Sequence, residues 1–241
     1  MSPSISDDIT HTLLREILQG EIEAGDKLPP ERELAVRFST NRNTLREALR
    51  NLATMNLIAA RQGDGLRVQD FRETGEWTLV PWLIQMEGGT VNERVQILED
   101  ILRLRRVLMG DMVRSLARQG TEEEILAMRA LVEAQRAHFG DARSMVETDL
   151  DLLLAMVAAS RSLAFKWIFN TVVRMYREIV FAHPGLLYFS DAYCDTYDAI
   201  LDACAAHDAD RAAEVIRAHL EESDEAILET IHALRVLSEE T

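Results

Sequence analysis

The chain has 241 residues, of which 47% are hydrophobic and 28% charged, and its formal net charge is −15. This length allows one large domain or two smaller folding units that each bury a core. No apolar run approaches the roughly 20 residues that span a bilayer, and Asp7 and Asp8 stand where a secretory signal would be positive, so we expect a cytoplasmic protein without a membrane partner.

The negative charge is concentrated in the second part of the chain. Residues 1–70 hold nine Lys or Arg against eleven Asp or Glu, a net charge of −2, which leaves −13 for residues 71–241. Five arginines of the first part fall within nineteen residues: Arg32, Arg37, Arg42, Arg46 and Arg50. DNA affinity depends on neutralising phosphates, and a local basic face can do this in a protein that is acidic as a whole.

Hydrophobic periodicity predicts three short helices at the start of the chain. The first places Ile9, Leu13, Leu14 and Ile17 on one face and ends before Gly20. Pro30 suits the first position of the second helix, and Asn41 suits the cap of the third. The expected buried faces of these two helices consist of Leu34, Ala35 and Phe38, and of Leu45, Ala48, Leu49 and Leu52.

A change of period after the third helix predicts a β-hairpin. Residues 57–59 and 66–68 are expected to form two short strands, because they flank the turn formed by residues 62–65, which contains two glycines. Three helices followed by a hairpin form a winged helix-turn-helix, in which the third helix can enter the major groove of DNA.

The outward residues of the third helix are suited to reading bases. Arg42, Asn43, Arg46 and Arg50 project away from the apolar face, and Arg and Asn pair with guanine and adenine edges. Arg32, at the start of the second helix, lies where the DNA backbone is expected to pass. The alternative interpretation is an ordinary solvated helix face.

The periodicity of residues 71–241 is helical throughout. We expect a linker helix within residues 71–89, followed by an all-α domain over residues 90–241. The expected spans are 91–118, 122–138, 143–159, 163–181, 187–206 and 208–236, with breaks near Gly120, Gly140, Arg161, His183-Pro184-Gly185 and His207-Asp208. Short connections between long helices predict an antiparallel bundle of six to seven helices, so the fold class is mainly α. The acidic run from Glu221 to Glu229 is interpreted as a solvated face of the last helix.

Two motifs carry a resemblance to a known family. The run GDKLPPERELA at residues 25–35, followed by NRNTLREAL at residues 41–49, resembles the N-terminal signature of the GntR superfamily of transcription regulators. The downstream helices resemble the FCD effector domain of its FadR subfamily, and residues 208–219 are similar to the last helix of that domain.

The resemblance implies a homodimer that binds double-stranded DNA at a palindromic operator. The positions that match DNA-contacting residues of the family are Arg32, Asn41, Arg42, Asn43, Thr44 and Arg46, and at the tip of the wing Gln62 and Gly63. We expect a repressor whose binding depends on a small metabolite.

The resemblance also implies a site between the helices of the second domain, and this sequence departs from its usual pattern. Most FCD domains hold a divalent metal with one aspartate and three histidines. Asp149 and His219 match two of these ligands, but Leu153 and Tyr197 stand where the other two histidines belong. Two remaining ligands rarely hold an ion such as zinc tightly, so we expect no cofactor and a metal-free organic pocket. The alternative is a degenerate site that still binds Zn, Ni or Mn.

Arg105 matches an arginine that points into this pocket in many relatives, and a buried guanidinium suits a carboxylate or another organic anion. The expected effector site therefore consists of Arg105, Asp149, Leu153, Tyr197 and His219. Three alternatives remain open. The effector is a fatty acyl-CoA, the polar residues are hydrogen-bonded core groups without a ligand, or the protein is a DNA-binding dimer with no effector at all.

An enzyme has little support in the sequence. A carboxylate-bridged metal pair in a helical bundle needs two Glu-x-x-His elements, and this chain has one, from Glu229 to His232. Gly-rich phosphate loops, nucleophile elbows and His-Glu-x-x-His motifs are absent from the sequence. We therefore expect a binding protein.

Overall fold

The computed structural model describes residues 4–85, 91–182 and 189–239. The chain forms two compact units, one up to Arg94 and one from Val95 onward. Within the described residues, no helix combines the length and the apolar character needed to cross a bilayer.

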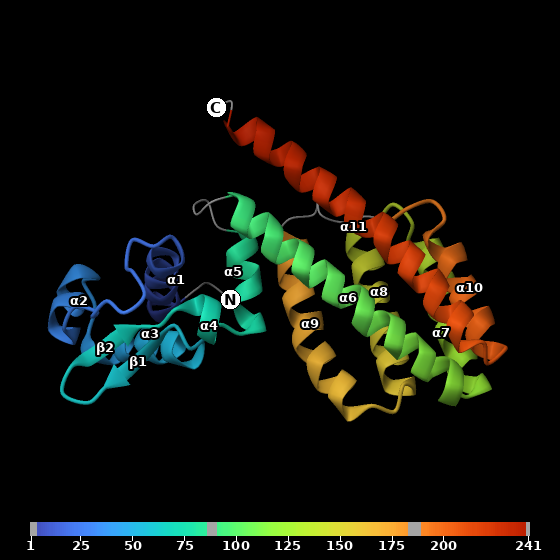
Figure 1. Cartoon of the computed structure of the whole chain (residues 1–241), viewed down its shortest axis with the longest axis horizontal. Helices are drawn as coiled ribbons and strands as arrows, with labels where there is room; N and C mark the ends of the chain where they lie inside the picture. The colour runs from blue at the N-terminus through green and yellow to red at the C-terminus, as the bar shows by residue number, and fades with distance from the viewer. Residues whose placement is uncertain (1–3, 86–90, 183–188, 240–241) are drawn as a thin grey trace. The chain divides into compact units, whose positions relative to one another are not determined.

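The first unit begins with three helices and a hairpin (Figure 1): α1 Ile5–Leu18, α2 Glu31–Arg37, α3 Arg42–Thr54, β1 Ile58–Arg61 and β2 Gly65–Val68. The strands pair antiparallel, with Ile58 opposite Val68. Leu13, Leu34 and Leu45, one from each helix, are at most 1% exposed and meet in one apolar core. The predicted winged helix-turn-helix is confirmed, with Pro30 acting as the cap that precedes α2 rather than as its first residue.

The segment expected to contain a linker helix holds three short elements: α4 Phe71–Thr74, a 3-10 turn η1 Trp77–Leu79 and α5 Val80–Gln85. Gly75 follows α4 in an extended conformation and separates it from the rest. A Cβ at this position would lie 2.4 Å from the Phe71 carbonyl oxygen, so the close approach requires glycine. Leu79 is buried in the core of the first unit. Residues 86–89 of the expected linker lie outside the described residues.

The second unit is a helical bundle, as predicted from its periodicity. Its helices are α6 Val91–Gln119, α7 Glu122–Ala137, α8 Ala142–Ala159, α9 Leu163–Ala182, α10 Tyr193–Ala205 and α11 Ala209–Glu239. Gly140, Arg161 and His207 have positive φ values and lie at three of the predicted breaks. The helix expected from residue 187 begins at Tyr193, and the expected break at residues 183–185 lies outside the described part of the chain.

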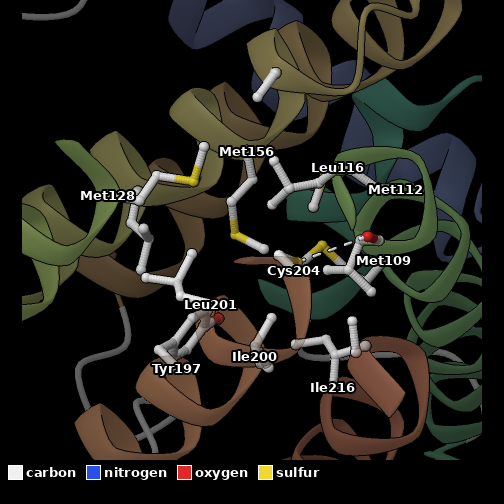
Figure 2. Packing of buried hydrophobic residues seen from close by; sticks show 14 of the residues in the cluster. Met109, Met112, Leu116, Met128, Met156, Tyr197, Ile200, Leu201, Cys204 and Ile216 are labelled. Carbon is white, nitrogen blue, oxygen red and sulfur yellow. Dashed lines mark hydrogen bonds between the residues drawn. The ribbon is translucent and has the colours of Figure 1, made fainter. Parts of the chain in front are cut away.

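Methionine-rich packing joins the helices of this bundle (Figure 2). Met112 of α6, Met156 of α8 and Cys204 of α10 are completely buried and lie close together in the interior. The Cys204 thiol faces the Val113 carbonyl at 3.9 Å, and burial raises the pKa of this thiol to about 12. Such flexible, polarisable side chains fill irregular space between helices. The fold class is thus mainly α, with one small hairpin in the first unit.

Candidate functional site

The first turn of α3 carries the residues predicted to read DNA. Asn41 caps the helix, because its Oδ1 accepts hydrogen bonds from the backbone N–H groups of Asn43 and Thr44 at 2.9 and 3.0 Å. This commits the Asn41 oxygen to the helix and leaves its amide nitrogen available. Arg42 and Asn43 are exposed, and Thr44 is half-buried. The cap therefore fixes the start of the helix from which these side chains project.

Arg46 is oriented by a partner that the sequence did not reveal. Its Nε donates to the carboxylate of Glu31, at 3.0 and 3.2 Å from the two oxygens, and the side chain remains 56% exposed. This ion pair connects α3 to the first residue of α2, next to the exposed Arg32. Because Glu31 engages Nε, the two terminal nitrogens of the guanidinium remain free to contact a base edge as a pair.

The wing is held by backbone pairing and by the charged contacts of Asp64, which lies in the turn between its strands. Gln62 and Gly63 lie exposed at the tip, where Gly63 has a φ of 76°. The Asp64 carboxylate accepts from Arg67 at 2.5 Å and from Lys27 at 3.4 Å. Segment 25–28 also pairs with β2 through three backbone hydrogen bonds of 2.9 Å. These contacts support a tip whose own residues are free to approach phosphates or a groove.

A buried polar cluster lies inside the second unit, built from four helices. The hydroxyl of Tyr193 donates to the carboxylate of Asp149. The ring centroids of Tyr193, Tyr197 and His219 lie 5.0 to 5.6 Å apart. Arg105 reaches this cluster from α6: its Nη2 donates to Ser223, one helical turn after His219 on α11, and its charge opposes the larger effect of burial on the pKa of Asp149. The structure therefore brings together four of the five residues predicted for the effector site.

The fifth predicted residue, Leu153, follows Asp149 by one helical turn on α8. It is half-buried and packs against two apolar clusters of the unit. Tyr193, which the sequence analysis missed, is the residue that joins Asp149 to the aromatic rings. A tyrosine four residues before Tyr197 lies on the same helical face, so this spacing was the available signal.

Arg105 is already paired inside the protein. Its Nη2 donates to Asp224 at 2.5 Å and to the Ser223 hydroxyl at 3.3 Å, and Arg106 donates to the same carboxylate at 2.5 Å. Asp224 is only 2% exposed. Interpreting residues 221–229 as a solvated face was therefore wrong for this residue, because Ser223 and Asp224 lie on the inner side of α11.

A groove of about 650 Å³ lies on another part of the same unit, between α6, α11 and Phe165 of α9. Arg106 lines it, whereas none of the five predicted effector residues does. Asp224 thus contacts one arginine of the groove and one arginine of the buried cluster. The candidate effector site is therefore the buried polar cluster, and the groove is a neighbouring feature.

Burial controls the protonation of the cluster. It raises the pKa of Asp149 to about 6, against the opposing effects of the Tyr193 hydrogen bond and of Arg105. Burial also lowers the pKa of His219, so that its imidazole is neutral at pH 7. At that pH the cluster contains the Arg105 cation, which is already paired with Asp224, and the ionised carboxylate of Asp149. The phenols of Tyr193 and Tyr197 complete it.

These residues do not fit the metal site of the family. The Asp149 carboxylate already accepts a hydrogen bond from Tyr193. Leu153 has no ligand atom, and the pKa of the Tyr197 phenol is raised by burial, which disfavours the phenolate that would bind a metal. No group of three His, Cys, Asp or Glu side chains within the described ranges is placed to share an ion.

We expect the raised pKa of Asp149 to appear as a pH dependence of stability. Between about pH 4 and 6 the folded chain binds a proton at Asp149 that the unfolded chain does not, so this contribution is present at low pH and is lost as the pH rises through about 6. Relative to Asp149→Asn, the wild type should lose on the order of 3 kcal/mol over this range. Urea unfolding of both proteins at several pH values measures the difference, and parallel curves would contradict it.

The first unit presents a capped helix with exposed arginines beside a wing, and the second unit encloses a buried polar cluster. These features are typical of a DNA-binding transcription regulator with a ligand-sensing domain. Residues 5–68 match the bacterial regulatory proteins of the gntR family, and residues 100–222 match the FCD domain. The chain belongs to the GntR family and carries an FCD effector-binding domain. This family consists of transcription regulators rather than enzymes.

Relatives cover nearly the whole chain. An uncharacterized HTH-type transcriptional regulator of Mycobacterium tuberculosis is 29% identical over 91% of this chain and 88% of its own length. A putative L-lactate dehydrogenase operon regulatory protein of Escherichia coli is 26% identical over 90% and 83%. The solved structure of Lar from Listeria monocytogenes has a TM-score of 0.60 at 15% identity, covering 95% of this chain and 99% of that one, and so supports the fold.

Proposed function

We propose that this protein is a homodimeric repressor that binds a palindromic operator and releases or retains it according to the concentration of a small organic anion. The DNA-binding domain comprises residues 1–70, the linker residues 71–89, and the effector and dimerisation domain residues 90–241. The observation that carries the proposal is the first part of α3, where Arg42, Asn43 and Arg46 are exposed while Leu45 is completely buried.

The proposed DNA contacts divide into two kinds. Arg42, Asn43 and Arg46 are suited to base edges in the major groove, because arginine and asparagine offer the paired donors and acceptors that guanine and adenine require. The remaining proposed contacts position the protein on the backbone or in the minor groove; they are Arg32, Asn41, Thr44, Gln62 and Gly63.

The proposed effector is a carboxylate or another organic anion. Arg105 supplies a cation beside Asp149, Tyr197 and His219, and Leu153 adds apolar surface. A guanidinium in such surroundings favours a planar anion. The name of the Escherichia coli relative refers to an L-lactate dehydrogenase operon, which supports a carboxylate as the chemical class.

The proposed dimer accounts for exposed apolar surface on the second unit. Val107 of α6 is 63% exposed and Trp167 of α9 is 68% exposed. The neighbouring groove contains side chains of both signs, for example Arg114 and Asp111. A two-fold contact can pair such groups reciprocally, because each copy offers both partners.

In this dimer the effector acts by favouring one spacing of the two recognition helices over another. The effector must therefore bind more tightly to the arrangement that it favours.

One set of measurements tests this function. Light scattering gives the mass, and fluorescence anisotropy compares the protein's own promoter fragment with random duplex at moderate salt. A thermal-shift screen covers short organic acids, sugar acids, amino acids and acyl-CoAs; an effector at one hundred times its Kd should add about 2.7 kcal/mol of stability.

We expect a dimer that prefers the promoter and is stabilised by at least one organic anion. No preference over random duplex would refute operator recognition. A response to acyl-CoA alone would favour the acyl-CoA alternative, and no response to any compound would favour a DNA-binding dimer without an effector.

A further inference from the structure

Three buried side-chain atoms have no hydrogen-bond partner among the described residues: Nε of Arg105 and both amide atoms of Gln135. Gln135 is completely buried on α7. Buried polar groups in folded proteins are nearly always paired, because leaving one unpaired forfeits its hydrogen bonds to water. The guanidinium nitrogen and the carboxamide therefore each require a polar partner that the described residues do not supply.

Contacts of two residues that follow Gln135 on the same helix place it at the level of the polar cluster. The next residue, Arg136, pairs with Asp195 at 2.7 Å and with Asp198 at 2.5 Å, on the turn of α10 that carries Tyr197. Three residues after Gln135, His138 Nδ1 lies 3.3 Å from the hydroxyl of Thr148, the residue before Asp149. Gln135 thus lies in the interior, beside the turns of α8 and α10 that supply Asp149 and Tyr197.

The unpaired atoms specify the chemistry of their partner. Arg105 Nε and Gln135 Nε2 are donors and require acceptors, whereas Gln135 Oε1 is an acceptor and requires a donor. An ionised carboxylate alone offers only acceptors, and an acyl chain offers neither. A hydroxycarboxylate offers both, because its carboxylate accepts and its hydroxyl donates.

We propose that Gln135 is a specificity-determining residue of the effector site, which binds the hydroxyl group of a hydroxycarboxylic acid whose carboxylate is held by Arg105. This inference rests on the proposed anion-sensing function and narrows its ligand class. Gln135 distinguishes a hydroxy acid from the corresponding acid without the hydroxyl. In the absence of that hydroxyl, its carboxamide remains without a donor.

The test uses matched pairs of acids that differ only in the hydroxyl group: lactate and propionate, malate and succinate, 2-hydroxybutyrate and butyrate. Calorimetric titration gives the Kd of each acid for the wild type, Gln135→Leu and Gln135→Met. Gln119→Leu is the matched control, because Gln119 lies on α6 and its amide is paired with the Ser160 carbonyl at 3.2 Å.

For at least one pair we expect the wild type and Gln119→Leu to bind the hydroxy acid at least tenfold more tightly. Both Gln135 variants should bind the two members of that pair about equally, with the affinity for the acid lacking the hydroxyl unchanged. Gln135→Met retains the shape of the side chain and covers the case in which Gln135→Leu does not fold.

Two outcomes overturn the inference, and they differ in whether the proposed anion-sensing function fails as well. If acids bind and the preference for the hydroxyl is absent, or persists in the Gln135 variants, Gln135 does not read the ligand, while anion sensing stands. If no acid binds the wild type although operator binding is intact, anion sensing fails, and this inference fails with it.

Discussion

Replacing Arg46 with alanine is expected to weaken operator binding by roughly 30- to 20,000-fold. A bidentate arginine contact to a base contributes about 1–3 kcal/mol of discrimination, and a dimer loses it in both half-sites. In this structure Glu31 engages Nε of Arg46 and leaves the two terminal nitrogens available for such a contact. Fluorescence anisotropy with the promoter fragment measures the loss.

The matched control for this variant is Arg129→Ala. Arg129 is also paired with an acidic side chain, Asp202 at 2.5 Å, but it belongs to the second unit. Its removal changes the net charge by the same amount and should leave operator affinity within about twofold, since surface ion pairs contribute little. Both variants should remain dimers by light scattering. Retained specific binding by Arg46→Ala would exclude α3 as the recognition helix.

Local signals made the first unit predictable from the sequence. The cap at Asn41, the glycines of the hairpin and the apolar period of each helix act within a few residues, and the structure reproduces them to within one or two positions. Gly75 was not recognised as the point that divides the linker segment, because the reason for glycine there is a clash with the Phe71 carbonyl that only the folded backbone reveals.

The second site was predictable only in part, because its polar partners come from distant segments. Asp149, Tyr197 and His219 were identified through the resemblance, and the structure places them together. Asp224 was not identified, because one acidic residue among several on a helix has no local feature that marks it as buried. Gln135 was missed for a related reason: a single glutamine on an amphipathic helix is ordinarily a surface residue.

Replacing Asp224 with asparagine is expected to tighten anion binding about ten- to hundredfold. Asp224 occupies Arg105 and also binds Arg106, so an incoming anion must compete with a carboxylate that is only 2% exposed. A hydrogen bond to a charged group contributes about 1.5–3 kcal/mol, and its loss removes that much of the competition. The cost appears in the free energy of unfolding, which should fall by about 1–3 kcal/mol, because both arginines are about 30% exposed and water partly replaces the lost partner.

Arg106→Ala separates this competition from a general loosening of the bundle. It removes an ion pair with the same carboxylate but leaves Asp224 on Arg105, so it should destabilise the protein without tightening anion binding. Arg105→Ala should abolish the anion response and retain operator binding. Calorimetric titration of the three variants with an anion found for the wild type ranks them. Equal tightening in Asp224→Asn and Arg106→Ala would show that Asp224 does not compete with the effector, whereas tightening in Asp224→Asn alone would show that Asp224 and the effector compete for Arg105.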